Sequence, residues 1–235
     1  MENIENSAFL ISIIIPVLNE TETINTTLAH LKNSGIGDDF EIIVVDGDSS
    51  ENTLKVIKNP DVVKVRSSKG RGLQMNQGAV AANGKVLVFL HCDTYLPDNA
   101  ANAIRAALAD NHAVGGAFDL SIQSDRQVYK IIAAVASLRT RITRIPYGDQ
   151  AIFIKKSFFF RIGGFQAIPI MEDVELMQRI KKKRCKIKII PDKVKTSSRR
   201  WQKEGVLYCT LRNWSIMLFY LAGVSPAKLS RFYKY

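Results

Sequence analysis

Three continuous apolar segments constrain the fold of this 235-residue chain more than any other feature. They read LISIIIPV at 10–17, FEIIVVD at 40–46 and GKVLVFL at 84–90, and a segment compatible with a helix follows each of them. Strands that are apolar on both faces are typical of a parallel sheet with helices on both sides. The sequence therefore predicts an α/β fold with a mostly parallel central sheet flanked by helices.

The remaining elements follow the same interpretation with less regularity. In the first half we expect a short strand at 62–67 and helices at 21–33, 51–58, 73–83 and 98–110. In the second half we expect strands at 115–122, 150–159 and 185–191 and helices at 127–142, 172–184 and 205–222. No internal repeat or low-complexity linker interrupts the chain, so we expect a single domain over 1–235.

Polar residues stand at the ends of three predicted strands. Asn19 and Glu20 follow the first strand, Asp46 ends the second, and His91 and Asp93 follow the third. The carboxyl ends of parallel strands meet at one edge of a sheet, and such sheets bind ligands at that edge. The three strand ends therefore predict one shared binding site.

A glycine-containing loop at 69–79, KGRGLQMNQGA, opens a helix. Gly70 allows the backbone to approach a ligand closely, and the helix N-terminus favours negative charge. Arg71 can hold a phosphate through two parallel hydrogen bonds. The G-x-G-x5-G spacing matches neither the dinucleotide fingerprint nor the P-loop, so a phosphate site and a purely structural turn both stay open.

The segment MEDVELMQRI at 171–180 places three carboxylates in the first turn of a predicted helix. One explanation is that acids there stabilise the helix dipole, by about 0.3 to 1 kcal/mol each. The preceding loop contains glycine and proline and can aim this turn into a cleft. Glu172 and Asp173 point to different sides of the helix, so one can be a general base while the other binds a substrate hydroxyl or a backbone amide.

Two further stretches carry polar residues next to strands. YGDQAIFI places Asp149 and Gln150 before a strand, and SSRRWQ places Arg199, Arg200 and Trp201 after one. Ordinary loop tips explain both stretches without chemistry. The functional alternative is a site for the acceptor or for a diphosphate.

Charge is distributed unevenly along the chain. The net charge of +11 divides into −6 for 1–127, with 10 basic and 16 acidic side chains, and +17 for 128–235, with 23 basic and 6 acidic ones. Basic clusters such as KKKRCKIK can meet phosphates, nucleic acid or an anionic membrane surface. They can equally form a solvated helix face.

The cysteines and the N-terminal segment indicate the compartment. Cys92, Cys185 and Cys209 are odd in number and widely spaced, which fits neither a disulfide framework nor a zinc site with paired ligands. The first apolar run follows Glu2 and Glu5 rather than positive charge, so it resembles a buried strand more than a secretory signal. Both observations favour a cytoplasmic location.

The segment VLYCTLRNWSIMLFYLAGV near the C-terminus is long enough to suggest a membrane span. Arg212 and Asn213 lie inside it, and an arginine near the centre of a span costs roughly 2.5 to 3.5 kcal/mol. We therefore expect a packed or interfacial helix. Burial against the sheet is slightly favoured over a homodimer contact or peripheral attachment at the inner face of an anionic membrane.

Taken together, IIIPVLNE, IIVVDGDSSENT, GRGLQMNQGA, FLHCDT and GGFQAIPIMEDVELMQRIKK resemble the family 2 glycosyltransferases over residues 10–200. The GDQAIF and SSRRW stretches resemble a small bacterial branch, the arsenosugar-biosynthesis-type glycosyltransferases. The resemblance implies the GT-A fold, with a Rossmann-like, mostly parallel sheet and here a helical C-terminal extension. It divides the domain into a nucleotide-binding half at 1–115, an acceptor-side half at 116–200 and the extension at 201–235.

The resemblance also assigns roles to residues. Asp93 matches the last acid of the DxD motif, which binds a divalent cation that bridges the donor diphosphate, and Asp173 matches the catalytic base, with Glu172 beside it. The donor nucleotide-sugar site is expected at Pro16, Asn19, Glu20, Asp46, Gly70, Arg71 and Asp93. The acceptor or diphosphate site is expected at Asp149, Gln150, Arg199, Arg200 and Trp201.

His91 stands where the family motif has its first acid. One carboxylate with two phosphate oxygens and waters can still hold Mg²⁺ or Mn²⁺. A nitrogen ligand from His91 would favour Mn²⁺. His91 can equally pack at the strand end or hydrogen-bond the ribose.

The resemblance thus implies an enzyme that moves a sugar from a nucleoside-diphosphate sugar to an acceptor hydroxyl, with metal assistance, inversion and Asp173 as base. The basic C-terminal half is compatible with a lipid-linked acceptor, and no nucleic-acid partner is expected. A sugar-phosphate nucleotidyltransferase is one alternative, but it would carry a basic glycine-rich loop where this chain has PVLNETET. A nucleic-acid or membrane-surface binding module without catalysis is another, but it leaves the acidic strand ends unexplained.

Overall fold

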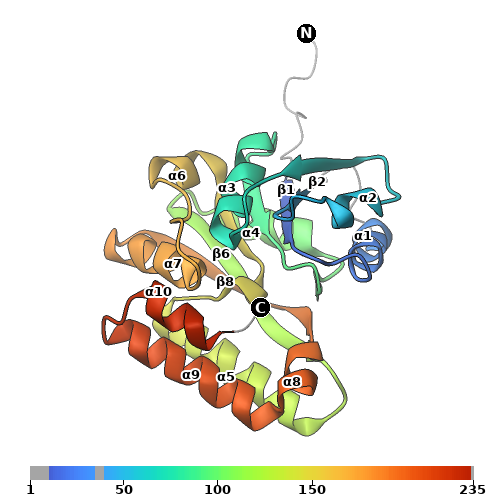
Figure 1. Ribbon diagram of the computed structural model, residues 1–235. Coiled ribbons are helices and arrows are strands. Elements are labelled where there is room, and N and C mark those ends of the chain that lie inside the picture. The colour runs from blue at the N-terminus through green and yellow to red at the C-terminus, as the bar shows by residue number, and fades with distance from the viewer. Residues whose placement is uncertain (1–10, 35–39, 234–235) are drawn as a thin grey trace.

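A computed structural model describes residues 11–34 and 40–233 (Figure 1). Within them an eight-stranded sheet has the order β3-β2-β1-β4-β7-β6-β8-β5. Its strands are β1 (Ile11–Val17), β2 (Phe40–Asp46), β3 (Val62–Arg66), β4 (Val86–Phe89), β5 (Thr94–Tyr95), β6 (Ala113–Gln123), β7 (Ile152–Lys155) and β8 (Lys186–Ser197). The predictions made for residues 1–10, including the acids before β1, lie outside the described residues.

The strands form two parallel groups joined by one reversed strand. β3, β2, β1 and β4 run parallel to one another, and β6 runs parallel to β8. β7 lies between the groups and is antiparallel to both β4 and β6, and β5 is antiparallel to β8. The expected mostly parallel sheet is therefore confirmed.

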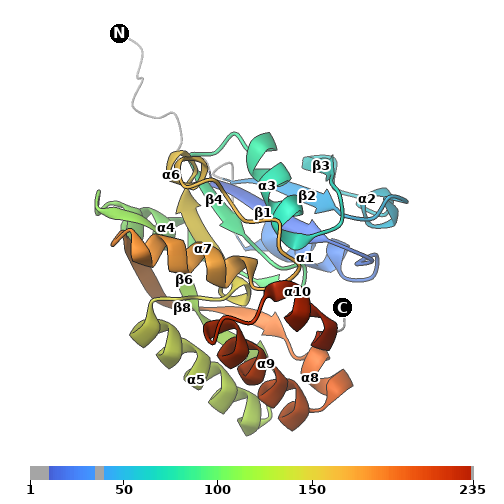
Figure 2. The same cartoon turned by 60° about the vertical axis from the view of Figure 1, so that its left-hand side comes forward.

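Helices cover both faces of the sheet (Figures 1 and 2). They are α1 (Ile24–Asn33), α2 (Asn52–Lys55), α3 (Arg71–Ala81), α4 (Ala100–Leu108), α5 (Gln127–Thr143), α6 (Lys156–Arg161), α7 (Glu172–Lys182), α8 (Arg199–Glu204), α9 (Val206–Leu221) and α10 (Pro226–Leu229), with 3-10 turns η2 (Gly148–Gln150) and η3 (Ser230–Phe232).

Successive residues of a strand point to opposite faces of the sheet. Ile13 and Ile15 therefore pack in one core with α1 and α4, while Ile14 packs in the other core with α3 and α7.

Two predicted boundaries in the second half are wrong. The strand expected at 150–159 ends at Lys155, where α6 begins. The strand expected at 185–191 continues through Pro191 to Ser197. The register against β6 shifts between Phe118 and Asp119, opposite this proline, and such a bulge accommodates a residue that cannot donate a ladder hydrogen bond.

The expectation that the C-terminal apolar helix is buried against the sheet is also wrong. In α9 the buried residues are Cys209 and Ile216, and most of the large apolar side chains of the helix are exposed. Across the described residues, no helix is both long enough and apolar enough to cross a membrane.

Candidate functional site

The predicted strand ends meet at one edge of the sheet. Val17 at the end of β1 pairs with Asp46 at the end of β2, and Ile14 in β1 pairs with Phe89 at the end of β4. The common direction of these strands delivers the segments that follow them to one place.

The loop after β1 is held in a defined conformation. Asn19 is exposed and has a left-handed backbone (φ 56°), and the Glu20 N–H donates to Thr53 Oγ1 at 3.1 Å. Pro16 is half-buried in β1 and pairs with Val45. Pro16 thus lies just inside the edge of the sheet, whereas Asn19 and Glu20 lie in the loop that follows β1.

Asp46 is fully buried, and its two carboxylate oxygens differ. Oδ1 accepts a hydrogen bond from the Asp48 N–H at 2.9 Å. Oδ2 is buried with no hydrogen-bond partner among the described residues. An unpaired buried oxygen is costly, so a ligand that donates an N–H to it is bound favourably.

Gln74 is a residue of this edge that the sequence motifs did not single out. Its Nε2 donates to the carbonyl oxygens of Val17 at 2.7 Å and Val45 at 2.9 Å, which ties α3 to the ends of β1 and β2. A Cβ atom at Gly47 would lie 2.9 Å from the side chain of Gln74. The signal that could have found Gln74 is helical periodicity, because residues four apart share a face and Gly78 is buried.

Arg199 joins the ends of β1 and β4. Its Nη2 and Nη1 lie 2.5 and 2.9 Å from the two carboxylate oxygens of Glu20, and its Nε lies 2.9 Å from Asp93 Oδ2. The hydrogen bonds that Arg199 donates to Glu20, together with the charge of Asp93, raise the pKa of Arg199. The positive charge of Arg199 therefore compensates the negative charges of Glu20 and Asp93.

Arg71, the first residue of α3, contacts the start of α7. Its Nη1 lies 3.4 Å from Glu172 Oε1, and Gly70 before it has a left-handed φ of 142°. Burial raises the pKa of Glu172, Arg71 opposes the rise, and the charge of Asp173 adds to it. The predicted glycine loop and the predicted acidic helix start are therefore in direct contact.

The carboxylate of Asp173 accepts two backbone hydrogen bonds. Oδ2 accepts from the Gly148 N–H at 2.6 Å, and Oδ1 accepts from the Val174 N–H at 2.7 Å. These bonds fix the orientation of the carboxylate. Each oxygen keeps a further lone pair with which it can accept a hydrogen bond from a substrate hydroxyl.

His91 lies against the same glycine. A Cβ atom at Gly148 would be 2.8 Å from His91 Nε2 and 3.3 Å from Asp173 Oδ2. Burial and three nearby arginines, with Arg71 foremost, hold the pKa of His91 well below its usual range. His91 is therefore neutral at pH 7. A cavity of about 10 Å³, lined in part by His91, Gly148 and Asp173, adjoins it and has room for about one water molecule.

Asp149 belongs to the same group of acids. Burial raises its pKa to about 6, Arg139 opposes the rise, and the charges of Asp173 and Asp93 add to it. Its neighbour Gly148 donates the backbone hydrogen bond to Asp173, so Asp149 lies in the turn that holds the predicted base.

Gln150 and Trp201 make their contacts inside the protein. Gln150 is fully buried, its Oε1 accepts from the Thr140 hydroxyl at 2.7 Å, and its Nε2 donates to the Phe118 carbonyl at 3.0 Å. Trp201 packs edge-on against Tyr129 with ring centroids 6.1 Å apart. For both residues, a role in binding acceptor or diphosphate stays a prediction.

Arg200 is half-buried near Arg71. Its guanidinium lies 4.8 Å from the ring centroid of Tyr233. Burial and the charge of Arg71 lower the pKa of Arg200. Two arginines that repel each other in a partly buried site favour the binding of an anion between them.

The side chains present fit a divalent cation that is bound partly by the protein and partly by the phosphates of a ligand. The described residues hold no group of three or more His, Cys, Asp or Glu side chains that could bind a metal ion. Asp93 supplies one carboxylate, whose Oδ2 also contacts Arg199. Mg²⁺ sites in proteins often use only one or two carboxylates together with phosphate oxygens and waters, so Asp93 is sufficient as a protein ligand.

The known sequences that resemble this chain are glycosyltransferases. The family model for glycosyl transferase family 2 matches residues 12–170. A PGL/p-HBAD biosynthesis glycosyltransferase from Mycobacterium bovis is 28% identical over 183 residues, which covers 68% of this chain and 64% of that protein. A poly(ribitol-phosphate) beta-glucosyltransferase from Bacillus spizizenii is 32% identical over 99 residues, which covers 38% of this chain and 16% of that protein. The chain spans less than two thirds of the length of either relative.

Two solved structures share the architecture. The mannosyltransferase PcManGT from Pyrobaculum calidifontis, in complex with GDP-Man and Mn²⁺, has a TM-score of 0.63 at 21% identity, covering 81% of this chain and 57% of that one. TarS 1-349 from S. aureus has a TM-score of 0.61 at 18% identity, covering 80% and 60%. The expected GT-A fold is confirmed, and because the family model matches the larger part of the sequence, the chain belongs to glycosyl transferase family 2.

Proposed function

We propose that this protein transfers a sugar from a nucleoside-diphosphate sugar to an acceptor hydroxyl, with inversion at the anomeric carbon. The observation that carries the proposal is the contact between the two halves of the site. The Arg71–Glu172 pair and the Gly148–Asp173 hydrogen bond hold the acidic start of α7 at the carboxyl edge of the parallel strands.

The donor binds along that edge. The unpaired Oδ2 of Asp46 accepts an N–H of the nucleobase, for which it is suited because it is buried and lacks a partner among the described residues. Arg71 and Arg200 bind the diphosphate from one side, and Arg199 does so from the other. The GDP-Man in the structure of PcManGT supports this class of donor.

Asp93 would hold a divalent cation, Mn²⁺ or Mg²⁺, together with the donor diphosphate, and the cation would supply positive charge to the leaving group. Because Nε2 of His91 lies beside Gly148, we assign His91 to the wall beside the proposed base.

The base is Asp173. An acceptor oxygen forms the new bond to the anomeric carbon from the face opposite the diphosphate, the old carbon–oxygen bond breaks, and the electron pair leaves with the diphosphate. The acceptor proton passes to the Asp173 carboxylate. The N–H groups of Gly148 and Val174 hold this carboxylate in position before the reaction, which lowers the entropic cost of aligning it.

The acceptor enters from the side of α7, and we propose that it is lipid-linked. An open groove of about 640 Å³ lies between α7 and the α9–α10 turn, lined in part by Lys181, Lys182, Tyr220 and Leu221. Tyr220 packs in the same cluster as Met171, the residue just before α7, so one end of the groove lies near the start of that helix. Apolar and basic groups in one groove suit an acceptor with a hydrocarbon part and an anionic part.

Release of nucleoside diphosphate from UDP- and GDP-sugars, with Mn²⁺ or Mg²⁺, tests the proposal. Asp173→Asn should abolish transfer and leave donor binding nearly intact. Loss of donor binding in this variant would make Asp173 a binding residue instead. Release of pyrophosphate from a nucleoside triphosphate and a sugar phosphate would favour a nucleotidyltransferase.

We further propose the one-domain organisation over 1–235, with a donor half at 1–115, an acceptor half at 116–200 and a helical extension at 201–235. A cytoplasmic location and membership of the arsenosugar-type branch are proposed as well. Residues 1–10, 35–39 and 234–235 of that domain lie outside the described residues. The C-terminal helix could also form a homodimer contact, as the sequence allows, and light scattering of the purified chain would measure its oligomeric state.

A further inference from the structure

α5 and α9 lie side by side on the part of the molecule farthest from β1–β3 (Figures 1 and 2). α5 packs its buried face, with Tyr129 and Ala133, against the sheet and the start of α9. The opposite side of α5 exposes a stripe of large apolar residues spaced by four, three and four positions: Ile131, Val135, Leu138 and Ile142. This spacing places all four on one face of the helix.

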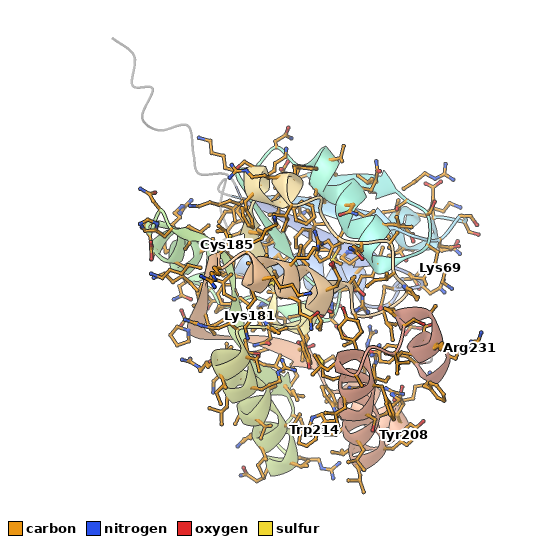
Figure 3. All side chains as sticks on the ribbon, turned by 90° about the vertical axis from the view of Figure 1, so that its left-hand side faces the viewer. Lys69, Lys181, Cys185, Tyr208, Trp214 and Arg231 are labelled. Carbon is orange, nitrogen blue, oxygen red and sulfur yellow. The ribbon has the colours of Figure 1, made fainter. Side chains whose placement is uncertain are left out.

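α9 carries a matching stripe. Its exposed residues at intervals of four and three are Leu207, Leu211, Trp214, Leu218 and Leu221, with Tyr208 and Phe219 beside them. Leu207 is 73% exposed and Trp214 58% exposed. Figure 3 shows Trp214 on the side of α9 toward α5 and Tyr208 on its other side, both in the lower part of the view and well away from Lys69 at the glycine loop. We call the two stripes together the two-helix face.

The charges around the two-helix face are almost all positive. Residues 126–144 contain no acid, and residues 199–233 contain one, Glu204, which is paired with Arg212 at 2.5 Å. Exposed basic side chains lie along and beyond the helices at Arg126, Lys130, Arg144, Lys203, Lys228 and Arg231, and Arg141 is paired with Asp119. Apolar side chains with Trp and Tyr, framed by cations, are typical of helices that lie in the interface of an anionic membrane.

A second copy of the chain fits this face less well. A symmetric dimer brings the same patch of both copies together, so it would set the basic rim of one copy against the basic rim of the other, which is unfavourable. An anionic lipid surface complements the rim and accepts the apolar stripes. Such a surface attracts Lys and Arg side chains that lie near it.

We propose that the two-helix face docks the protein on the interface of an anionic lipid bilayer, with α5 and α9 lying in the membrane plane. Leu221 belongs both to this face and to the groove between α7 and the α9–α10 turn. Docking therefore opens the groove toward the lipid. This last step rests on the proposed function, whereas the docking itself does not.

Flotation with vesicles tests the docking independently of sugar transfer. The protein should float with phosphatidylcholine vesicles that contain phosphatidylglycerol, float less as salt is raised, and float little with phosphatidylcholine alone. The double variant Trp214→Glu with Leu218→Glu should lower the bound fraction about tenfold, because it adds charge and removes two anchors. The matched control is Val80→Glu, since Val80 is 64% exposed on α3 and outside the face, and it should bind normally.

Tryptophan emission gives a second readout. Trp214 is exposed and Trp201 is packed against Tyr129, so anionic vesicles should shift the emission of the protein to shorter wavelength through Trp214. Trp214→Phe should still float but lose the shift.

The docking proposal is overturned if the unaltered protein fails to float with either vesicle type, or if the double variant floats as well as the control. A solution dimer that the double variant dissociates, without vesicle binding, would instead assign the face to a second copy. Failure of donor turnover in a protein that still docks would count against the proposed function alone.

Discussion

Arg199 Nε lies 2.9 Å from Asp93 Oδ2, so the carboxylate proposed to hold a divalent cation already carries an ion pair within the protein. A cation that approaches Asp93 must share the carboxylate with this guanidinium or displace it. The arginine is half exposed, and such pairs contribute about 1 kcal/mol or less. A divalent cation that binds together with a diphosphate can therefore displace Arg199 from the Asp93 carboxylate.

We predict that Arg199→Gln strengthens the binding of Mn²⁺ to the nucleotide-free protein up to about fivefold, which corresponds to the loss of this competitor. Electron paramagnetic resonance of free Mn²⁺ during a titration measures the effect. The control is Arg141→Gln, which removes the ion pair to Asp119 on another part of the surface. Unchanged or weaker Mn²⁺ binding in Arg199→Gln would contradict the role given to Asp93.

Asp46→Asn should weaken donor binding at least about tenfold, with little change in turnover at saturating donor. The amide can still accept the Asp48 N–H through its oxygen, but it then presents an NH₂ donor where Oδ2 was an acceptor. A nucleobase N–H would face another donor, and leaving such a group unpaired costs about 1–3 kcal/mol. Calorimetric titration with nucleoside diphosphates measures the change. An unaltered affinity would show that the nucleobase lies elsewhere.

Gly148→Ala should lower turnover by about one to two orders of magnitude while the affinity for the donor stays close to normal. The added methyl would lie 2.8 Å from His91 Nε2 and 3.3 Å from Asp173 Oδ2, so it should displace Asp173, the proposed base. Misplacement of a reacting group by about 1 Å can cost a hundredfold in rate. Combining Gly148→Ala with His91→Ala makes room for the methyl and should restore part of the rate. A parallel loss of donor binding would mean that Gly148 supports the donor site instead.

Asp149 should make the folded protein less stable as pH rises from 4 to 6. Its pKa of about 6 in the fold exceeds the value near 3.9 of an unfolded aspartate. Between these values the folded state binds more protons than the unfolded state, so stability falls with rising pH, and above pH 6 the cost is constant. Asp149→Asn removes a cost of up to roughly 3 kcal/mol at pH 7. Urea unfolding at pH 4.5 and pH 7 measures it, with Asp125→Asn as the control for an exposed carboxylate.

The first half of the fold follows from sequence because three β-branched, apolar runs admit little besides buried parallel strands. The same logic predicts that Glu20, Asp46 and Asp93 meet at one edge, since parallel strands end together. Glu172 and Asp173 can be recognised as a pair, but their distance from that edge depends on where β7 and α7 pack. No local pattern encodes that packing.

The side-chain contacts that define the site cannot be predicted from local sequence patterns. The ion pair of Arg199 with Glu20 and Asp93 joins residues far apart along the chain. Which atom of His91 points at Gly148 depends on side-chain packing that spacing does not reveal. The burial expected for α9 failed for a related reason, because helical periodicity finds an apolar stripe but does not say what covers it.

β7 pairs with β4 over four residues, with Ile152 opposite Phe89 and Lys155 opposite Val86. Because β7 runs against β4, the residues just before Ile152 lie beside those just after Phe89, and this brings Gly148 next to His91. Had the strand run the other way, the same turn would lie at the opposite end of the pair, about 10 Å away at 3.3 Å per residue. The polarity of one short strand thus decides whether Asp173, the proposed base, lies beside the proposed donor edge.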